Sequence, residues 1–99
     1  MEIDCLREVF GSQLEKIPVS STKSQIGHTL GAASAIEAAL SIEAMQKGLV
    51  LPTVNHLPDP ELDDIDVVPN RVRKMTYDIL LSNAFGFGGT NCCVVFRGI

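Results

Sequence analysis

An alanine-rich segment between Gly27 and Lys47 is the strongest indication of regular structure in this chain. It reads GHTLGAASAIEAALSIEAMQK, in which Ala, Leu, Ile, Glu and Met are good helix formers, and Gly48 follows as a stop. Its many small residues leave little polar surface along most of its length: Gly31, Ala32, Ala33, Ser34, Ala35, Ala38 and Ala39. We therefore expect a long, buried helix that packs closely against other elements, with an exposed Ala-rich surface helix as the alternative.

A second pattern lies near the C-terminus, where a glycine-rich stretch separates two apolar runs. The runs are residues 79–81 (ILL) and 92–96 (CCVVF), and residues 85–91 between them read FGFGGTN. Apolar runs bounded by turn residues are typical of buried strands, and glycine permits turn conformations that are closed to other residues. The pattern predicts a C-terminal β-hairpin with two buried strands.

Weaker patterns cover most of the remaining chain. Residues 3–10 place apolar side chains at helical spacing before Gly11, which predicts a short amphipathic helix. Residues 18–22 are rich in β-formers and predict a strand that leads into a turn, and residues 65–69 predict another short strand. Three prolines and an acidic cluster mark residues 51–64 as an irregular connection.

Composition limits the functions that are open to the chain. Its 99 residues make at most one small domain, which buries only about 60–65% of the surface of its unfolded chain and is marginally stable without a partner. The formal net charge is -4 and no basic run is present, so nucleic acid is not expected as a partner. No apolar stretch reaches the roughly 20 residues that span a bilayer, so a membrane is not expected either.

The first residues and the cysteines indicate the compartment. Residues 1–5 lack the basic and apolar regions of a secretory signal, so we expect a reducing, cytoplasmic location. Cys5, Cys92 and Cys93 are an odd set with one adjacent pair, which suits neither a disulfide framework nor a CxxC zinc site. We expect buried thiols and no metal site.

The segment that begins the long predicted helix also carries residues able to do chemistry. His28 would stand at the helix start, where the partial positive charge favours a neutral imidazole that can donate a hydrogen bond to a carbonyl. The alternative is that His28 only caps backbone groups. Lys23 in the preceding turn and Glu37 further along the helix would each, considered alone, be ordinary solvated side chains.

The glycine-rich loop leaves two interpretations open as well. It matches neither GxxxxGK(S/T) nor GxGxxG, so a phosphate-binding loop is not expected. One interpretation is a tight glycine turn between strands. The other is that an exposed backbone N–H of the loop serves as an oxyanion donor.

Two motifs carry a resemblance to a known family. Residues 22–33 read TKSQIGHTLGAA, and residues 86–91 read GFGGTN before a strand that ends in VVF. In this order and spacing they resemble the motifs of β-ketoacyl-acyl-carrier-protein synthases of the elongating type, over about residues 2–99. The resemblance implies the C-terminal half of a thiolase-like α/β fold, in which a mixed sheet accompanies the long buried helix and the C-terminal β-hairpin.

The same resemblance implies a decarboxylating condensation without a cofactor. These enzymes hold an acyl thioester on a cysteine and condense it with malonyl-carrier protein, releasing carbon dioxide and a β-ketoacyl product. His28 would hold the malonyl thioester carbonyl, Lys23 would orient the histidine network, and Glu37 would pair with Lys23. Around the oxyanion hole, the implied residues are Phe87 as the gating phenylalanine that supplies an N–H, Gly86 and Gly88 as its hinges, and Phe85 and Asn91 as supporting residues.

The chain also departs from the family pattern. Nothing in it matches the nucleophilic cysteine or the HGTxTxxxD motif of the first active-site histidine, and His56 matches no catalytic position. Cys92 and Cys93 stand where the family has packing residues. We therefore expect residues 1–99 to be one incomplete domain that is inactive alone. Its partners would be the missing N-terminal half, a second copy in a homodimer, and acyl carrier protein with its acyl and malonyl thioesters.

Two further interpretations remain open. The chain could be part of a polyketide-type ketosynthase or of its non-condensing chain-length partner, or it could be a non-enzymatic scaffold domain that keeps the fold without the chemistry. The complete reading frame distinguishes them. An upstream cysteine turn with HGTxTxxxD indicates the enzyme, a substituted cysteine indicates the chain-length partner, and a native start at Met1 indicates the scaffold.

Overall fold

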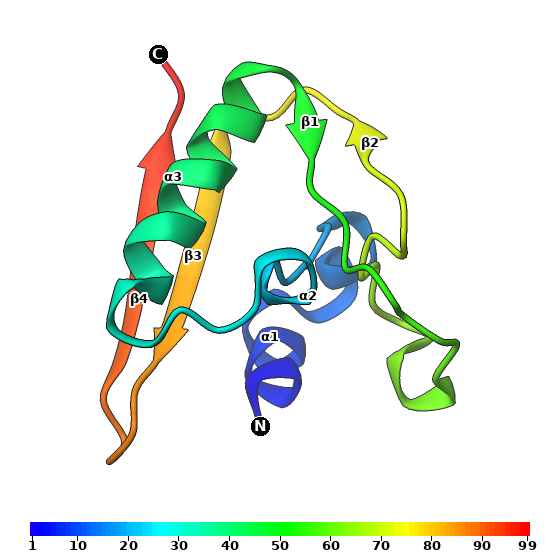
Figure 1. Cartoon of the computed structure of the whole chain (residues 1–99). Coiled ribbons are helices and arrows are strands. Elements are labelled where there is room, and N and C mark those ends of the chain that lie inside the picture. Colours follow the sequence, from blue (N-terminus) through cyan, green and yellow to red (C-terminus); the bar gives the residue numbers. More distant parts are fainter.

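The computed structural model describes residues 1–99 as a mixed α/β structure, in agreement with the predicted class (Figure 1). The α-helices are α1 (Glu2–Phe10), α2 (Lys23–Ile26) and α3 (Ala33–Gln46). The strands are β1 (Leu49–Val50), β2 (Arg73–Lys74), β3 (Ile79–Phe85) and β4 (Asn91–Arg97). Turns of 3₁₀ helix cover Gly11–Lys16, Leu30–Ala32 and Pro60–Leu62. No helix is long and apolar enough to cross a membrane.

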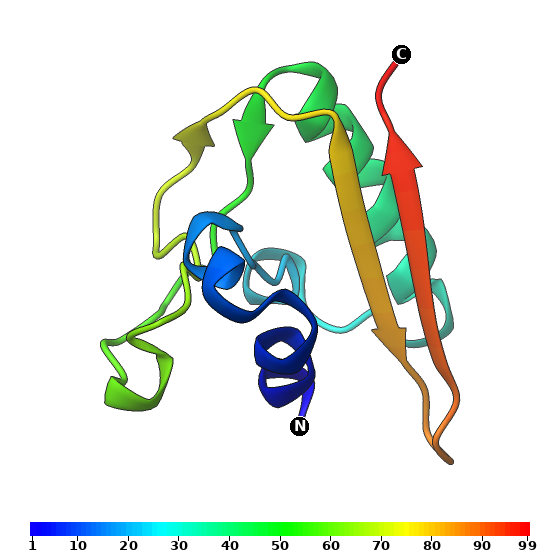
Figure 2. The same cartoon turned by 180° about the vertical axis from the view of Figure 1, so that it is seen from behind.

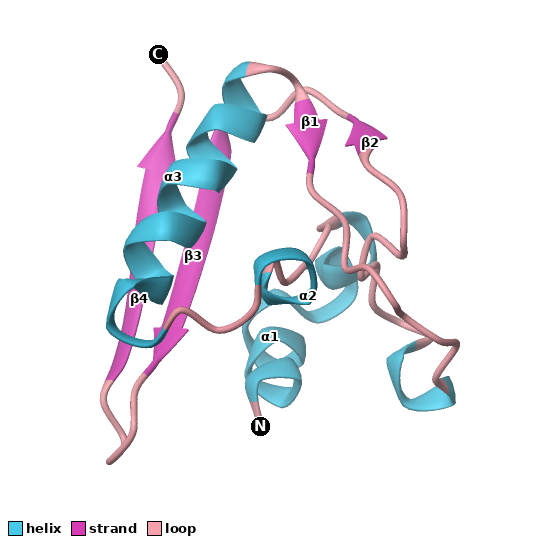
Figure 3. Cartoon of the chain, in the orientation of Figure 1, coloured by secondary structure: helices cyan, strands magenta, loops and turns pink.

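The C-terminal hairpin is the longest β structure in the chain (Figure 3). β3 and β4 pair in antiparallel register from Ile79 opposite Arg97 to Phe85 opposite Asn91, so the predicted hairpin is confirmed. The prediction that its strands are buried is wrong for this chain, because Val95 is 61% exposed. The reason is that α3 covers the hairpin on one face only, and the other face is open in the view from behind (Figure 2).

The prediction that the three thiols are buried is wrong as well. Cys5, Cys92 and Cys93 are all exposed rather than buried. Cys92 and Cys93 lie in β4, which pairs with β3 alone and is therefore an edge strand. An edge strand with one covered face leaves even apolar side chains in contact with solvent.

The Ala-rich helix is shorter and less buried than the sequence predicts. Gly27 (φ 79°) and Leu30 (φ 53°) have left-handed backbone conformations that an α-helix does not include, so α3 begins only at Ala33. Within α3 only Ala33 and Ala44 are buried, and Leu40 remains exposed. The helix carries apolar side chains all round, so packing one face against β3 leaves another apolar face uncovered.

A second, separate sheet replaces the mixed sheet that we expect from the sequence. β1 and β2 form a two-stranded antiparallel ladder with Leu49 opposite Lys74. Both ladders are antiparallel and no strand joins them, so a single mixed sheet is wrong for this chain. The one parallel pairing is an isolated bridge between Thr53 and Pro69. Strands as short as β1 and β2 are too brief to show an alternating apolar pattern, which is why the sequence does not reveal them.

The two short strands predicted at residues 18–22 and 65–69 do not form. The segments do lie side by side, because the Val19 N–H donates to the Asp66 carbonyl oxygen at 2.8 Å. A strand needs consecutive extended residues, however, and Val68 has a left-handed φ of 51°. Ile65 and Val68 of the second segment are nevertheless buried, as are Leu14 and Val50.

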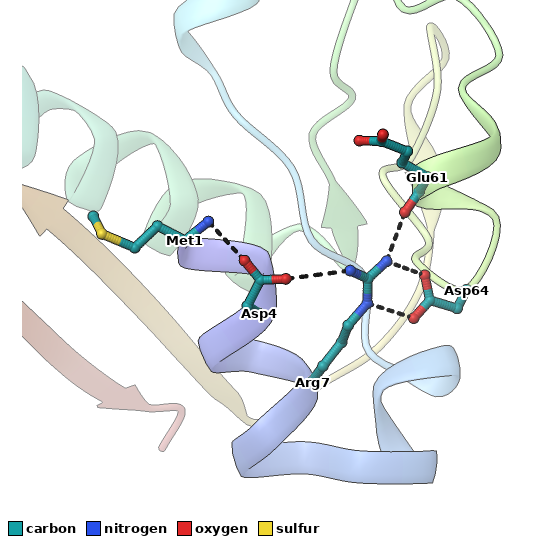
Figure 4. Close-up of polar contacts among 5 residues, drawn as sticks. All are labelled: Met1, Asp4, Arg7, Glu61 and Asp64. Carbon is teal, nitrogen blue, oxygen red and sulfur yellow. Dashed lines mark hydrogen bonds and ion pairs between the residues drawn. The ribbon is translucent and has the colours of Figure 1, made fainter.

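The predicted N-terminal helix is confirmed as α1, and an arginine ties it to the distant acidic loop (Figure 4). Arg7 Nε and Nη2 donate to the two carboxylate oxygens of Asp64 at 2.7 and 2.6 Å, and Nη2 also donates to the Glu61 carbonyl oxygen at 2.6 Å. The Arg7 guanidinium lowers the pKa of the Asp64 carboxyl below its ordinary value. This bidentate pair positions the acidic loop against α1.

Candidate functional site

Lys23 lies on a single helical turn rather than in the plain turn that the sequence predicts. Thr22, just before α2, is buried, and its carbonyl oxygen accepts from the Gln25 N–H at 2.9 Å. Gly27 ends the turn with a φ of 79°, and its N–H donates to the Lys23 carbonyl oxygen at 2.9 Å. The backbone of Lys23 is therefore held in a defined conformation.

The Lys23 ammonium reaches Glu37 on the adjacent helix α3. Lys23 Nζ donates to Glu37 Oε1 at 2.5 Å, and the two side chains are 39% and 14% exposed, respectively. Charge-assisted hydrogen bonds are short, and partial burial strengthens them because less water screens the charges. Each residue considered alone would have been a solvated side chain, but the structure brings the two together.

His28 lies in the irregular link between α2 and the 3₁₀ turn at Leu30–Ala32, not at the start of the long helix. Its Nδ1 accepts a hydrogen bond from the Leu30 N–H at 3.0 Å. A neutral imidazole that accepts through Nδ1 carries its proton on Nε2. His28 thus caps a backbone group and, with the same ring, offers an Nε2–H donor. Capping a backbone group and donating a hydrogen bond to a carbonyl are therefore compatible roles for His28.

Residues 23–37 fold back so that the side chains of Lys23 and Glu37 meet, and His28 belongs to the stretch of chain that connects them. The sequence analysis attributed the donating form of the His28 imidazole to a helix start at this residue. The long helix α3 begins only at Ala33, so the helix dipole is not the cause. Here the local hydrogen bond to Leu30, rather than the helix dipole, sets the form in which the imidazole can donate.

The glycine-rich loop is an exposed turn at the tip of the hairpin. Phe87 is 97% exposed, and the Gly86 N–H donates to the Thr90 carbonyl oxygen at 2.6 Å. Of the two expected hinges, only Gly88 has a left-handed conformation, with a φ of 82°; Gly89, which the sequence analysis did not single out, shares it with a φ of 84°. Phe85 and Asn91 face each other as the last pair of the ladder, at the base of the loop.

The loop and the Lys23 stretch lie at the same end of the molecule but are not joined. Figures 1 and 2 both place the start of α3 and the hairpin tip at this end. No hydrogen bond or ion pair connects the loop to Lys23, His28 or Glu37. In this chain, then, the two motifs are neighbours without direct polar contact.

Two features near these residues escaped the sequence analysis. An apolar cleft of about 200 Å³ lies between α3 and the hairpin, lined by Ser34, Ala35, Ala38, Ser82, Ala84, Cys92, Val94 and Phe96. The hydroxyl of Thr29, beside His28, is buried without a hydrogen-bond partner, which is a costly arrangement for a polar atom. Periodicity alone could not reveal either feature, because both depend on how separate elements pack.

No group of His, Cys, Asp or Glu side chains is arranged to hold a metal ion. The pKa shifts lie elsewhere in the chain. Arg73 lowers the pKa of Asp66 through a hydrogen-bonded ion pair, and burial raises the pKa of Tyr77, whose hydroxyl donates to the Leu49 carbonyl oxygen at 2.9 Å. These groups support the fold around residues 49–77.

Comparison with known proteins decides the family. Residues 1–57 match the family model described as the C-terminal domain of β-ketoacyl synthases, and this range includes Lys23, His28 and Glu37. The chain belongs to the β-ketoacyl synthase family. The resemblance drawn from the two sequence motifs is thereby confirmed.

Individual relatives agree with this assignment. The chain is 44% identical to 3-oxoacyl-[acyl-carrier-protein] synthase 2 of Coxiella burnetii over 100% of its own length and 24% of that protein. It is 43% identical to nodulation protein E of Rhizobium sp. (strain N33), over 100% of its own length and 25% of that protein. The chain thus spans about a quarter of the length of the curated relatives that it matches.

A solved β-ketoacyl synthase structure also shares the arrangement of the elements. A type II polyketide ketosynthase, solved in complex with its acyl-carrier protein and bound to the hexaketide, matches with a TM-score of 0.92 and 34% identity. The match covers 99% of this chain and 24% of that one. A β-ketoacyl synthase from Burkholderia phymatum matches with a TM-score of 0.78 and 39% identity over 84% of this chain and 21% of that one.

Proposed function

We propose that residues 1–99 are the C-terminal part of a 3-oxoacyl-acyl-carrier-protein synthase of the elongating type, with a cytoplasmic location. The observation that carries the proposal is the Lys23–Glu37 pair, which joins the two ends of a segment that contains His28 and has the family's motif order. Identity of 44% over the whole chain to a 3-oxoacyl-acyl-carrier-protein synthase supports the same reaction. The complete enzyme would form a carbon–carbon bond between an acyl thioester and malonyl-carrier protein as carbon dioxide leaves.

In this proposal His28 stabilises the enolate that forms when the malonyl group loses carbon dioxide. Its Nε2–H would donate to the thioester carbonyl oxygen, where negative charge develops. The Leu30 N–H keeps the proton on Nε2 by donating to Nδ1. Lys23, held by Glu37, would orient this histidine network and contribute positive charge near the developing anion.

The hairpin loop would serve the acyl-transfer step. An N–H at Phe87 would contribute to the oxyanion hole, and its exposed side chain would act as the gate. Gly88, with its left-handed backbone, fits a hinge beside Phe87, and Gly86 would be the second hinge. Phe85 and Asn91 would support the loop from the end of the ladder.

The proposed enzyme needs parts that this chain does not supply. No residue here matches the nucleophilic cysteine or the first active-site histidine, so we expect the chain alone to be inactive. We propose that the covering for the open apolar faces of α3 and the hairpin comes from the remainder of a thiolase-like fold, assembled as a homodimer. Acyl carrier protein would deliver both thioesters. The proposed reaction would use no metal or cofactor.

One observation favours a second candidate from the same superfamily. The polyketide ketosynthase solved with its carrier protein matches over 99% of the chain with a TM-score of 0.92. Polyketide-type condensation, or the role of the non-condensing chain-length partner, therefore remains the alternative. A stand-alone scaffold domain has weaker support, because a scaffold needs neither the Lys23–Glu37 ion pair nor the Nε2–H donor that His28 offers.

The decisive experiment separates the two half-reactions in the complete enzyme. His28→Ala should slow malonyl decarboxylation by roughly 100- to 1000-fold, because it removes a donor to the developing enolate. Acylation of the nucleophilic cysteine should remain measurable. Radiolabelled carbon dioxide release and covalent acyl-enzyme formation report the two steps, and His56→Ala, which changes the other histidine, is the matched control. Decarboxylation at the parent rate in His28→Ala would contradict the assignment.

A further inference from the structure

The short helix that carries Lys23 cannot hold its own shape. α2 contains only the four residues Lys23–Ile26, and helices far shorter than about 12 residues are unstable in water without tertiary contacts. The Lys23 side chain is also long and flexible, and holding it in one conformation costs conformational entropy. The ion pair with Glu37 therefore needs a rigid base under Lys23.

Three hydrogen bonds supply that base, and they connect α2 and the preceding residue Ser21 to the segment 52–54. The Ser24 hydroxyl accepts from the Val54 N–H at 2.9 Å and itself donates to the Ser21 carbonyl oxygen at 2.9 Å. The Thr53 hydroxyl accepts from the Ser21 N–H at 3.1 Å. Finally, the Gln25 side-chain amide donates to the Pro52 carbonyl oxygen at 2.9 Å.

The segment 52–54 is itself fixed from its other side. The Thr53 N–H donates to the Val68 carbonyl oxygen at 3.0 Å, and the Thr53 carbonyl oxygen accepts from the Asn70 N–H at 2.9 Å. Pro52 and Val68 are buried. The hydroxyl groups of Ser24 and Thr53 thus connect the α2 turn to a backbone that has little freedom to move.

We propose that Ser24 and Thr53 are positioning residues for Lys23: their hydroxyl groups fasten the α2 turn to the segment 52–54 and so keep the Lys23 ammonium at Glu37. This inference rests on the proposed function, in which Lys23 orients the histidine network. Neither hydroxyl needs to touch a substrate. Their effect on the reaction passes through the position of Lys23.

The first test measures malonyl decarboxylation by the complete enzyme. Ser24→Ala leaves the part-buried Val54 N–H without its acceptor, and we expect kcat to fall about 10-fold with little change in KM, because the unpaired N–H loosens the attachment of the turn that carries Lys23. Ser24→Thr keeps the hydroxyl and should restore most of the rate. Thr53→Val should give a smaller loss, and Thr53→Ser should restore it.

The controls separate positioning from plain stability. Ser12→Ala changes an exposed serine in the first 3₁₀ turn and should leave kcat unchanged. Rates are divided by the folded fraction measured by circular dichroism, so that loss of folded protein does not count as loss of kcat. A normalised kcat for Ser24→Ala equal to that of the parent would overturn the proposal.

A double-mutant cycle gives the sharpest outcome. If Ser24 acts through Lys23, Ser24→Ala should lower kcat little further once Lys23→Ala is present, because no Lys23 ammonium is then left to position. If the fold-decrease in kcat of the double variant equals the product of the two single fold-decreases, Ser24 acts independently of Lys23. That result overturns the positioning proposal while leaving the proposed function intact. If Lys23→Ala itself leaves kcat unchanged, the role of Lys23 in the proposed function is wrong, and the positioning proposal falls with it.

Discussion

The two halves of the molecule are held together in different ways. The core region, which contains α2 and the buried side chains of Leu14, Pro52, Ile65 and Val68, has almost no regular sheet but many specific hydrogen bonds between distant segments. The helix–hairpin layer, made of α3, β3 and β4, has long regular elements, yet much of its apolar surface is open. Regular secondary structure and burial are therefore separate properties in this chain.

The largest expected contrast concerns one side chain in each half. Leu14 is 2% exposed, and Leu14→Ala should lower the free energy of unfolding by about 2–5 kcal/mol, because it leaves a cavity in a small core. Val95→Ala, at a position 61% exposed, should change it by less than about 0.5 kcal/mol. Urea unfolding followed by circular dichroism measures both. Equal losses would show that the hairpin contributes as much burial as the core.

Self-association tests the open face of the helix–hairpin layer. Uncovered apolar surface seeks a partner, so the 99-residue chain should form larger species as its concentration rises through the micromolar range. Val95→Lys should weaken this association, whereas Val9→Lys, at an exposed apolar position on α1, should leave it largely unchanged. Sedimentation velocity gives the distribution of species. A strictly monomeric parent chain would contradict the prediction.

A smaller effect is expected at the hairpin turn. Gly88 has a φ of 82°, and forcing a side chain into this left-handed conformation costs roughly 1–2 kcal/mol, so Gly88→Ala should destabilise the hairpin by about that amount. Gly86→Ala is the matched control, because the φ of Gly86 is not left-handed and an added Cβ would meet Thr90 only at an ordinary contact distance of 3.5 Å. Thermal unfolding compares the two variants, and identical shifts would argue against backbone strain at Gly88.

The smallest expected effect is a pH dependence within the core region. Arg73 lowers the pKa of Asp66 in the folded chain, so this pair stabilises the fold above the unfolded carboxyl value of about 3.9 and loses its contribution as the pH falls below it. The pair is only partly buried, so water screens it and the loss should be below about 1 kcal/mol.

Arg73→Gln tests the cause of that pH dependence. It should reduce the fall in unfolding free energy below about pH 4, because it removes the hydrogen-bonded ion pair that is the main cause of the lowered Asp66 pKa. Lys74→Gln removes a neighbouring exposed charge and is the control. The same acid slope in Arg73→Gln and the parent would rule out the ion pair as its source.

The sequence by itself determined the elements whose signals are local. The amphipathic spacing before Gly11 predicted α1, and the apolar runs on either side of FGFGGTN predicted the hairpin. The two motifs also indicated the family, because residue identity at fixed spacing survives without knowledge of packing. Lys23, His28 and Glu37 could be named from these motifs, but their geometry could not.

Only the tertiary structure decided what depends on distant contacts. It delayed the start of the long helix to Ala33, because the chain turns through left-handed conformations at Gly27 and Leu30, and it placed the Lys23 ammonium 2.5 Å from Glu37. It also left α3 and the hairpin partly open, although their sequences are as apolar as buried elements. The physical reason is that periodicity reports which side chains can be buried, whereas burial itself requires a second surface, and the elements of this chain cover each other on one face only.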